Sequence, residues 1–365
     1  MQTLAVTPQP GQPPEELDTP QVLIDLDVAD ANLRRMFAAA RRYGVAVRVH
    51  FKSLKCTGLA KHIAAAGADG FLCAKLSEAE VLADAGLTDI LIANQVVGPL
   101  KLRRLAELAK RASLRVCVDD PDNVAAIGRA AGEAGATLGV LVEVDVGMRR
   151  CGVEPGGPVL ELARHVARFP SLRFDGLQGY DGHLQQVRDP AEREQRCREG
   201  MRRLTETRKL LEGAGVPVRV VTGGGTGTWE FVASTPGVTE IQPGSFVLMD
   251  CTYREVRPEF GCALSVLTTV ISRRENWYVL DAGSKAISQD FGKPVIKGRP
   301  GDRVLFLAEE HTKVETDDGT VRVGDRVEVI PSHCCATMNL HRRCVAVRGG
   351  RVGHVWPIEA SGRYD

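Results

Sequence analysis

Three basic side chains alternate along one otherwise apolar segment, Arg48-Val49-His50-Phe51-Lys52. In an extended chain this alternation points Arg48, His50 and Lys52 to the same face. A lysine at the end of such a strand, partly desolvated and close to other cations, would hold a share of neutral amine, the form that reacts with a carbonyl compound. Because most isolated lysines are solvated loop residues, this segment alone leaves both interpretations open.

Two later segments have the composition of anion-binding loops. Residues 222–227 read TGGGTG, and residues 242–245 read QPGS. Glycines let backbone N–H groups approach an anion closely, and the hydroxyl groups add donors. The sequence has no Walker pattern and no GxGxxG motif opening a helix after the first strand. The two loops therefore favour a small phosphate-bearing ligand over a nucleotide.

A third group could bind a metal ion. His333 and Cys335 are two apart on a segment that we expect to be extended, so their side chains point the same way. Imidazole and thiolate suit zinc or a similar divalent ion. Since no second Cys/His pair lies nearby, the predicted site is open, and water or substrate completes it. The alternative is a buried cysteine beside a hydrogen-bonded histidine.

The elements that position these residues alternate between strand-like and helix-like patterns. Eight apolar runs, separated by amphipathic stretches of helical length, lie at residues 45–51, 70–74, 90–93, 114–118, 138–146, 172–179, 216–221 and 238–241. Eight such units in about 200 residues predict a (β/α)8 barrel, although a doubly wound sheet also alternates in this way. In a barrel, Lys52 and the two loops follow strands 1, 7 and 8 at the face where active sites form. Asp181 and His183 follow strand 6 at the same face.

The pattern changes near residue 257, where period-two alternation and turn signals begin. We predict an α/β fold with a (β/α)8 TIM-like barrel over residues 18–256, followed by a C-terminal β-domain over residues 257–365 that carries the metal pair. Residues 1–17 are rich in Pro and Gln and lack periodicity, so we expect a disordered N-terminal tail.

Composition argues against several classes of protein. The 365 residues carry a net charge of +1 and are 44% hydrophobic, which is ordinary for a globular protein and offers no basic field to nucleic acid or anionic membranes. No apolar run approaches the roughly 20 residues of a membrane span, and the polar start is unlike a secretory signal. Ten irregularly spaced cysteines in so long a chain predict reduced thiols and a cytoplasmic location.

Taken in order, these motifs resemble the fold-type III pyridoxal 5'-phosphate (PLP) enzymes, and among them the D-threonine aldolase and D-serine dehydratase group. The matching segments are DTP (18–20), RxHxK (48–52), VEVDVGMRRCG (142–152), GLQGY (176–180), TGGGTG (222–227), TEIQPGSFVLMD (239–250), DAG (281–283), EH (310–311) and HCCATMNL (333–340).

The resemblance implies roles for the matched residues. The implied cofactor-binding residues are Arg48, His50, Lys52, Arg150, Tyr180, Thr222, Gly224, Gly225, Thr226, Gly244 and Ser245. Lys52 would bond covalently to PLP, and the residues from the two loops would hold its phosphate. Tyr180 would lie beside the pyridine ring, and Arg150 would point into the site. His333 and Cys335 would bind a divalent metal such as Zn, Mn or Mg. A homodimer is also implied, because the β-domain of one subunit closes the barrel of the other in this family.

The sequence departs from the aldolases at three informative places, one of which is Phe51-Lys52-Ser53-Leu54 in place of the commoner Ala/Val-Lys-Thr/Ser-His. Aldolases commonly have aspartate where Cys335 stands, whereas cysteine is typical of the D-serine dehydratases. The slot of an aldolase histidine that helps to deprotonate the substrate hydroxyl is Gln186 here, so His183 becomes the candidate catalytic base. Because more of the chain is aldolase-like, we expect cleavage of D-3-hydroxy-amino acids to glycine and an aldehyde. The alternatives are a dehydratase giving 2-oxo acid and ammonia and, more remotely, an amino-acid racemase.

Overall fold

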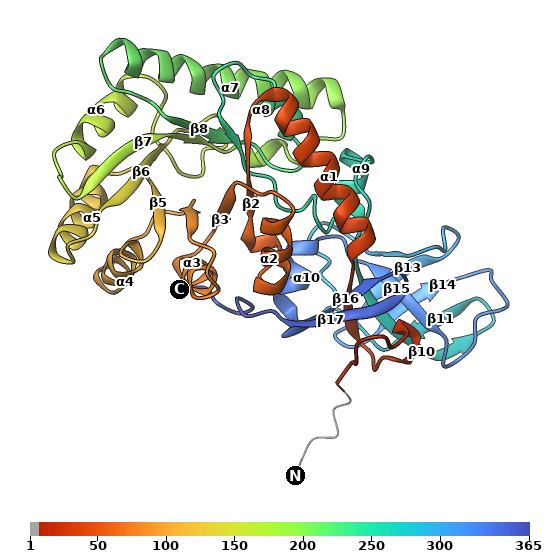
Figure 1. Cartoon of the computed structure of the whole chain (residues 1–365). Coiled ribbons are helices and arrows are strands. Elements are labelled where there is room, and N and C mark those ends of the chain that lie inside the picture. Colours follow the sequence, from red (N-terminus) through yellow and green to blue (C-terminus); the bar gives the residue numbers. More distant parts are fainter. Residues whose placement is uncertain (1–6) are drawn as a thin grey trace. The chain divides into compact units, whose positions relative to one another are not determined.

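The computed structural model describes residues 7–365, which divide into two compact units (Figure 1). The barrel unit comprises Arg35–Lys52, Ala60–Gly244 and Arg363–Asp365, and the β unit comprises Ser53–Leu59, Ser245–Gly362 and the N-terminal residues up to Arg34. Each unit is therefore assembled from separate stretches of the chain. Within the described range, no helix has both the length and the apolar character that a membrane crossing needs.

Eight parallel strands close into a barrel, with β2 pairing both β3 and β9, which confirms the predicted (β/α)8 fold. The strands are β2 (Ala46–His50), β3 (Gly70–Cys73), β4 (Asp89–Ile92), β5 (Ser113–Val118), β6 (Leu138–Glu143), β7 (Leu172–Gly179), β8 (Val220–Gly223) and β9 (Glu240–Ile241). Their residues are almost continuously buried, as expected for parallel strands that are covered on both faces.

Helices connect the strands, and Figure 1 shows α3 to α7 on the outside of the barrel strands. The helices are α1 (Leu26–Tyr43), α2 (Thr57–Ala65), α3 (Leu76–Asp84), α4 (Pro99–Ala109), α5 (Pro121–Glu133), α6 (Gly157–Val166), α7 (Pro190–Gly213) and α8 (Trp229–Ala233). Proline occupies the first turn of α4 to α7, where its missing N–H group costs no helical hydrogen bond. Asp120 and Asp189 cap α5 and α7 with their side chains.

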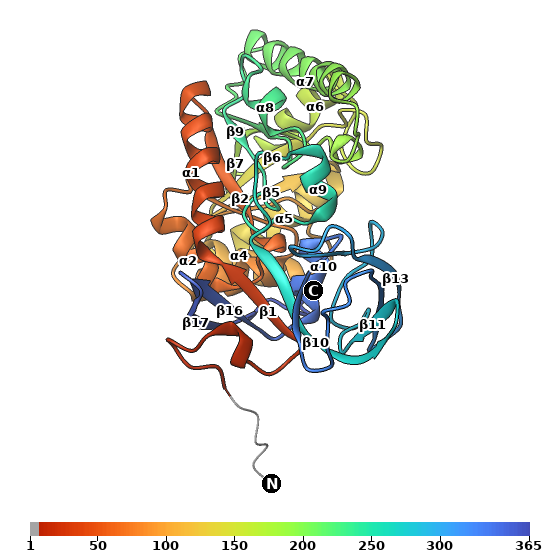
Figure 2. The same cartoon turned by 90° about the vertical axis from the view of Figure 1, so that its right-hand side faces the viewer.

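The β unit is built on a sheet with the strand order β13-β14-β11-β10-β1-β16-β17, to which β15 and β12 are joined through β10. Its elements are β1 (Gln21–Asp25), α9 (Cys251–Val256), β10 (Leu264–Arg274), β11 (Trp277–Leu280), β12 (Val295–Ile296), β13 (Arg303–Leu307), β14 (Thr312–Glu315), β15 (Arg326–Ile330), α10 (Cys334–Leu340), β16 (Arg343–Arg348) and β17 (Arg351–Pro357). Figure 2 shows β1 between β10 and β16.

This pairing corrects the predicted domain boundaries of 18–256 and 257–365. The strand β1 is antiparallel to β10 and parallel to β16, so its backbone hydrogen bonds belong to the β unit although its residues begin the chain. The DTP and DAG motifs meet there, since the Thr19 hydroxyl donates to Asp281 over 2.5 Å and Asp281 accepts from the Thr269 N–H over 2.7 Å. Both motifs are thus explained by the fold of this unit.

The disordered tail predicted for residues 1–17 is wrong for its second part, and residues 1–6 lie outside the described residues. Pro14–Glu16 form the 3-10 helix η1. The Gly11 N–H donates to the Val352 carbonyl over 2.7 Å, and the Val352 N–H donates to Gln12 over 2.9 Å. Leu17 is buried in a cluster with Leu23 and Val345. Pairing with β17 therefore orders a segment whose composition alone suggested a loose chain.

Candidate active site

Lys52 lies directly after β2, in the 3-10 helix η2 (Phe51–Ser53). Its Nζ atom is 5.8 Å from the centroid of the Tyr180 ring, and the Arg150 Cζ atom is 5.4 Å from the same centroid. Tyr180 follows β7, and Arg150 lies in the loop after β6. Three residues predicted from distant motifs therefore meet at the carboxyl ends of three barrel strands.

The alternation that grouped Arg48 with Lys52 ends at His50, because η2 begins at the next residue. The buried Arg48 guanidinium forms ion pairs with Asp89 and Glu240, both at 3.0 Å. Burial opposes the charge of Arg48, but these two carboxylates raise its pKa above the ordinary value. The partners of Arg48 within the barrel are therefore these two carboxylates, and the cofactor-binding role that the resemblance implies for Arg48 stays a prediction.

His50 remains at the end of β2 and is buried. Its Nδ1 atom lies 3.1 Å from the Leu72 carbonyl of the neighbouring strand. Its backbone N–H donates to the Pro243 carbonyl over 3.1 Å, which ties this strand end to the second predicted anion loop.

The glycine loop after β8 has the features of a ligand cradle. The Thr222 hydroxyl is buried and has no hydrogen-bond partner among residues 7–365. Gly224 has φ +70°, and a Cβ atom there would lie 2.8 Å from Val232 Cγ2. A Cβ atom on Gly225 would lie 2.5 Å from Gln185 Oε1. The orphaned hydroxyl and the tight glycine backbone fit an anionic oxygen bound at this loop.

Further polar residues of the site were not predicted. At the end of β6 the Glu143 carboxylate accepts a hydrogen bond of 2.5 Å from Gln95 Nε2 and lies 3.8 Å from Arg150 Nη2. Burial raises the pKa of Glu143, while Gln95 and Arg150 lower it. Gln242 Nε2 donates to Gln178 Oε1 over 2.9 Å, and this amide pair is buried. The sequence signal that could have identified these residues is a polar side chain at the end of an otherwise apolar strand.

His183 lies in the 3-10 helix η3 (Gly182–Leu184), three residues after Tyr180. Its side chain is exposed, yet partial burial lowers the pKa of His183, and the nearby Asp181 opposes that shift. A neutral imidazole at neutral pH can accept a proton. Gln186, in the slot where aldolases have a histidine, is partly buried.

The predicted metal pair lies in the β unit, but its local structure is not extended. His333 caps α10, so Cys334 and Cys335 occupy the first helical turn. The His333 ring hydrogen-bonds the Cys335 sulfur, and together with Asp250 this sulfur raises the pKa of His333 to about 9 against the effect of burial. The Cys334 thiol also hydrogen-bonds Cys335, in contrast to the expectation that alternation turns it away.

Surrounding residues hold this pair in place. Asp250 accepts from the backbone N–H groups of Tyr253 (2.8 Å) and Cys334 (2.9 Å), which connects α9 to the start of α10. Burial raises the pKa of Asp250 to about 6. The Cys335 thiol donates to the Ser53 hydroxyl over 3.0 Å. Among the described residues, His, Cys, Asp and Glu form no cluster of three or more that could hold a metal ion, so the pair offers two protein ligands.

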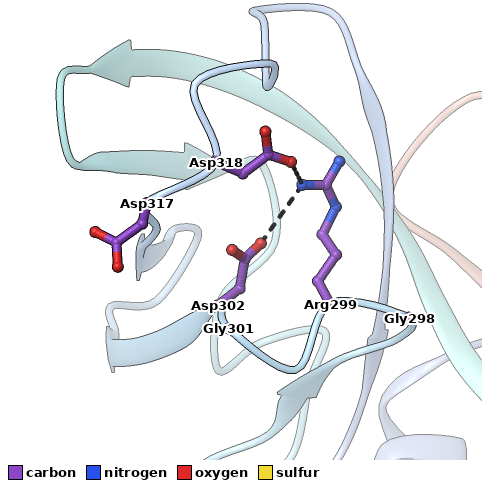
Figure 3. A pocket seen from close by; sticks show the side chains of 6 residues that line it. All are labelled: Gly298, Arg299, Gly301, Asp302, Asp317 and Asp318. Carbon is purple, nitrogen blue, oxygen red and sulfur yellow. Dashed lines mark hydrogen bonds and ion pairs between the residues drawn. The ribbon is translucent and has the colours of Figure 1, made fainter.

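A separate cavity of about 430 Å³ in the β unit does not add to the site. It is lined by Gly298, Arg299, Gly301, Asp302, Asp317 and Asp318 (Figure 3). Arg299 pairs with Asp318 at 2.9 Å and with Asp302 at 3.8 Å, and Asp302 also accepts from the Tyr278 hydroxyl. The charges that line this cavity are therefore largely compensated within the fold.

Two family models match consecutive parts of the chain. One, described as alanine racemase, N-terminal domain, matches residues 24–251, and the other, described as putative serine dehydratase domain, matches residues 263–347.

Individual relatives match almost the whole chain. D-threonine aldolase from Arthrobacter sp is 41% identical over 97% of this chain and 95% of its own length. 3-Hydroxy-D-aspartate aldolase from Paracoccus denitrificans (strain Pd 1222) is 37% identical over 97% of this chain and 95% of its own. D-threo-3-hydroxyaspartate dehydratase from Delftia sp. (strain HT23) is 31% identical over 88% of this chain and 92% of its own. The dehydratase is thus the more distant relative.

Solved structures agree with this ranking. D-threonine aldolase from Filomicrobium marinum superposes with a TM-score of 0.95 at 40% identity, covering 98% of this chain and 99% of that chain. A cysteine-to-alanine mutant of D-threo-3-hydroxyaspartate dehydratase in the metal-free form superposes with a TM-score of 0.85 at 29% identity, covering 95% and 98%.

Proposed function

The chain belongs to the alanine racemase-like family of fold-type III PLP enzymes, and we propose that it is a PLP- and metal-dependent lyase that cleaves D-3-hydroxy-amino acids to glycine and an aldehyde. The observation that carries the proposal is the meeting of Lys52, Tyr180 and Arg150 at the strand ends of the barrel. The greater similarity to two aldolases than to a dehydratase supports the choice of reaction.

The residues of the barrel unit fit PLP, which when bound supplies an electron sink for the bonds of the substrate α-carbon. Lys52 would hold the cofactor through its amine, and Tyr180 would lie beside the ring. The buried Thr222 hydroxyl, which lacks a partner among the described residues, and the backbone at Gly224 would hold the phosphate. Glu143 and Gln95 orient Arg150.

His183 is the base that receives the proton of the substrate β-hydroxyl, directly or through one water. Removal of this proton lets the hydroxyl oxygen become the carbonyl oxygen of the aldehyde as the Cα–Cβ bond breaks. The lowered pKa of His183 supports this role, because the imidazole is then largely neutral at pH 7.

The proposal includes a divalent metal on His333 and Cys335, and an ion held there would acidify the hydroxyl group of the substrate. Imidazole and thiol are suitable donors, and the two side chains already hydrogen-bond each other. Within the β unit, the Cys335 thiol donates to the Ser53 hydroxyl, and its sulfur lies 3.6 Å from the Ser245 hydroxyl.

A dehydratase is the second candidate, because a cysteine at the position of Cys335 is typical of the D-serine dehydratases. A racemase is a weaker candidate, since that reaction gives no role to the His333–Cys335 pair. Incubation with D-threonine separates the outcomes. The proposal expects glycine and acetaldehyde. Release of 2-oxobutanoate and ammonia without glycine would establish the dehydratase, and formation of L-threonine alone would establish the racemase.

We also propose that the enzyme is a homodimer. Two apolar side chains on the barrel unit, Val97 before α4 and Leu100 in its first turn, are 63% and 67% exposed. Exposed apolar side chains in a cluster often mark protein contacts. Their place beyond the carboxyl end of β4, at the face that bears Lys52, supports an interface at this face of the barrel unit.

Finally, we propose a cytoplasmic location. The ten cysteines are all free thiols, and seven of them are buried. Free thiols in this number suit a reducing compartment.

A further inference from the structure

The glycine loop after β8 is supported from its inner side by one buried carboxyl group, that of Asp181. This residue follows Tyr180, is fully buried, and accepts hydrogen bonds at both oxygens. Its Oδ1 atom accepts from Gln185 Nε2 (3.0 Å) and from the Thr228 hydroxyl (3.1 Å). Its Oδ2 atom accepts from the Cys197 thiol on α7 (3.2 Å).

Thr228 and Gln185, the two partners of Asp181 Oδ1, also hydrogen-bond the backbone of the loop. The Thr228 hydroxyl accepts from the Gly225 N–H over 3.3 Å, and Gln185 Oε1 accepts from the Gly227 N–H over 2.8 Å. Gln185 Nε2 also donates to the Thr228 hydroxyl over 2.9 Å. Two N–H groups of the loop are therefore already used within this network. Phosphate contacts are left to other groups of the loop, such as the Thr222 hydroxyl.

The loop backbone also lies very close to Gln185. A Cβ atom at Gly225 would lie 2.5 Å from Gln185 Oε1, and one at Gly227 would lie 2.2 Å from the Gln185 carbonyl oxygen. The backbone thus packs directly on Gln185. Because Gln185 itself is held by Asp181, the carboxyl group determines where the loop backbone lies.

We infer that Asp181 is a positioning residue: by holding residues 225–228, it fixes the glycine loop in the shape that lets Thr222 and Gly224 bind the phosphate of the cofactor. The inference rests on the proposed function, because it requires that a phosphate binds at this loop. Asp181 touches neither the reacting atoms nor the phosphate in this account. It acts through Thr228 and Gln185.

None of the arginines and lysines in residues 7–365 forms an ion pair with Asp181. Burial raises the pKa of Asp181, while the hydrogen bonds from Thr228 and Cys197 and the nearby His183 lower it. The contribution of Asp181 to the loop is therefore that of a hydrogen-bond acceptor. Asparagine should replace Asp181 with little loss, because its side-chain oxygen can accept from both Gln185 and Thr228.

The test compares the binding of PLP and of pyridoxal, which lacks the phosphate, to the full-length protein freed of cofactor. Both ligands share the ring and the aldehyde that reacts with Lys52, so the ratio of their dissociation constants isolates the phosphate contribution. We expect Asp181→Ala to weaken PLP binding about 10-fold or more and to change pyridoxal binding by less than about 2-fold. Asp181→Asn should keep a ratio close to that of the wild-type protein.

Two further variants keep the test decisive if Asp181→Ala folds poorly. Thr228→Val has nearly the same shape but no hydroxyl, and it should lower the PLP preference in the same way. Asp189→Ala removes a different carboxylate, which caps α7 by accepting from the Ala191 and Glu192 N–H groups, and serves as the matched control. It should lower the melting temperature without changing the ratio.

The outcomes separate the inference from the proposed function. If the wild-type protein binds PLP no more tightly than pyridoxal, both the phosphate loop and the inference are overturned. If the wild-type protein prefers PLP, but Asp181→Ala or Thr228→Val keeps that preference, the inference alone is wrong.

Discussion

His183 carries the proton transfer in the proposed reaction, and its surroundings set the pH range in which it can do so. Partial burial lowers the pKa of His183 from its ordinary value of 6.5, and Asp181 only partly opposes this shift. A base is active when it is deprotonated. Activity should therefore be present at neutral pH and fall as the pH drops through a value below about 6.5.

Substitution of this histidine should remove most of the rate of cleavage. It should also remove the acid limb of the pH–rate profile, which is the fall in activity at low pH. We expect His183→Ala to lower kcat for D-threonine cleavage about 10²- to 10⁴-fold, the usual contribution of a positioned general base, with PLP still bound. The matched control is His165→Ala, because His165 lies on α6 and its ring contacts the Pro121 carbonyl. A pH–rate profile of the variant that keeps the acid limb would contradict this assignment.

The two adjacent cysteines at the start of α10 should respond differently to substitution. Cys335→Ala removes a proposed ligand, so metal content measured by elemental analysis should fall to background and turnover should be lost. Cys334→Ala is its neighbour and control. It removes a fully buried thiol and should retain the metal while losing about 1 kcal/mol of unfolding free energy. Retention of metal by the Cys335 variant would refute the proposed ligand pair.

Chelation should act like the Cys335 substitution and leave the fold intact. The start of α10 is anchored by the hydrogen bond from the Cys334 N–H to Asp250, which needs no metal. A structural metal would behave differently, because its binding free energy contributes directly to folding.

At the scale of elements, the barrel interior is held by ion pairs in which Arg48 is central. Its guanidinium bridges Asp89 and Glu240, and Glu240 is buried. Arg48→Met should therefore lower the unfolding free energy by about 3 kcal/mol or more, because it leaves a buried carboxylate without its cation. Equilibrium unfolding in guanidinium chloride measures this loss of unfolding free energy. Arg103→Met, at an exposed position on α4, is the control.

The same variant decides what Arg48 does. The structure predicts that folded Arg48→Met protein binds PLP normally. Normal stability combined with lost PLP affinity would instead establish the cofactor-binding role that the family resemblance implies for Arg48.

Elements differ in how far the sequence alone could predict them. The eight barrel strands were found because buried parallel strands read as continuous apolar runs. The strand β1 was missed, since its partners β10 and β16 lie far away in the sequence. The local pattern of apolar residues does not indicate such distant pairing. The segment after His333 was expected to be extended. The contact from Asp250 to the Cys334 N–H favours a helical turn instead, and only the fold brings Asp250 there.

The site was predictable to the extent that its residues belong to motifs. Lys52, Tyr180 and the glycine loop were all expected and are found at strand ends. Gln178 and Gln242 lie within the matched segments GLQGY and QPGS, but their contact was not predicted, because a buried amide does not reveal its partner until the fold is known. Asp181 was noted only for its place after a strand. Its contacts with Gln185 and Thr228 depend on tertiary packing.

At the scale of the whole molecule, the proposed dimer can be tested on the barrel unit. Val97→Asp combined with Leu100→Asp places charges on the exposed apolar pair and should shift the enzyme from dimer to monomer in sedimentation equilibrium. Leu210→Asp is the matched control, because Leu210 is also exposed but lies on α7. A wild-type monomer, or a double variant that stays dimeric, would contradict the proposed interface.

The account depends most directly on the covalent attachment of PLP to Lys52. Borohydride reduces the carbon–nitrogen double bond between a lysine and the cofactor and makes the attachment permanent. After reduction of the PLP-loaded enzyme and proteolysis, mass spectrometry should find the pyridoxyl group on the peptide that contains Lys52, and Lys52→Ala should lose both the label and the turnover of D-threonine. Labelling at Lys55 or Lys75 in its place, or an active Lys52→Ala enzyme, would contradict the account.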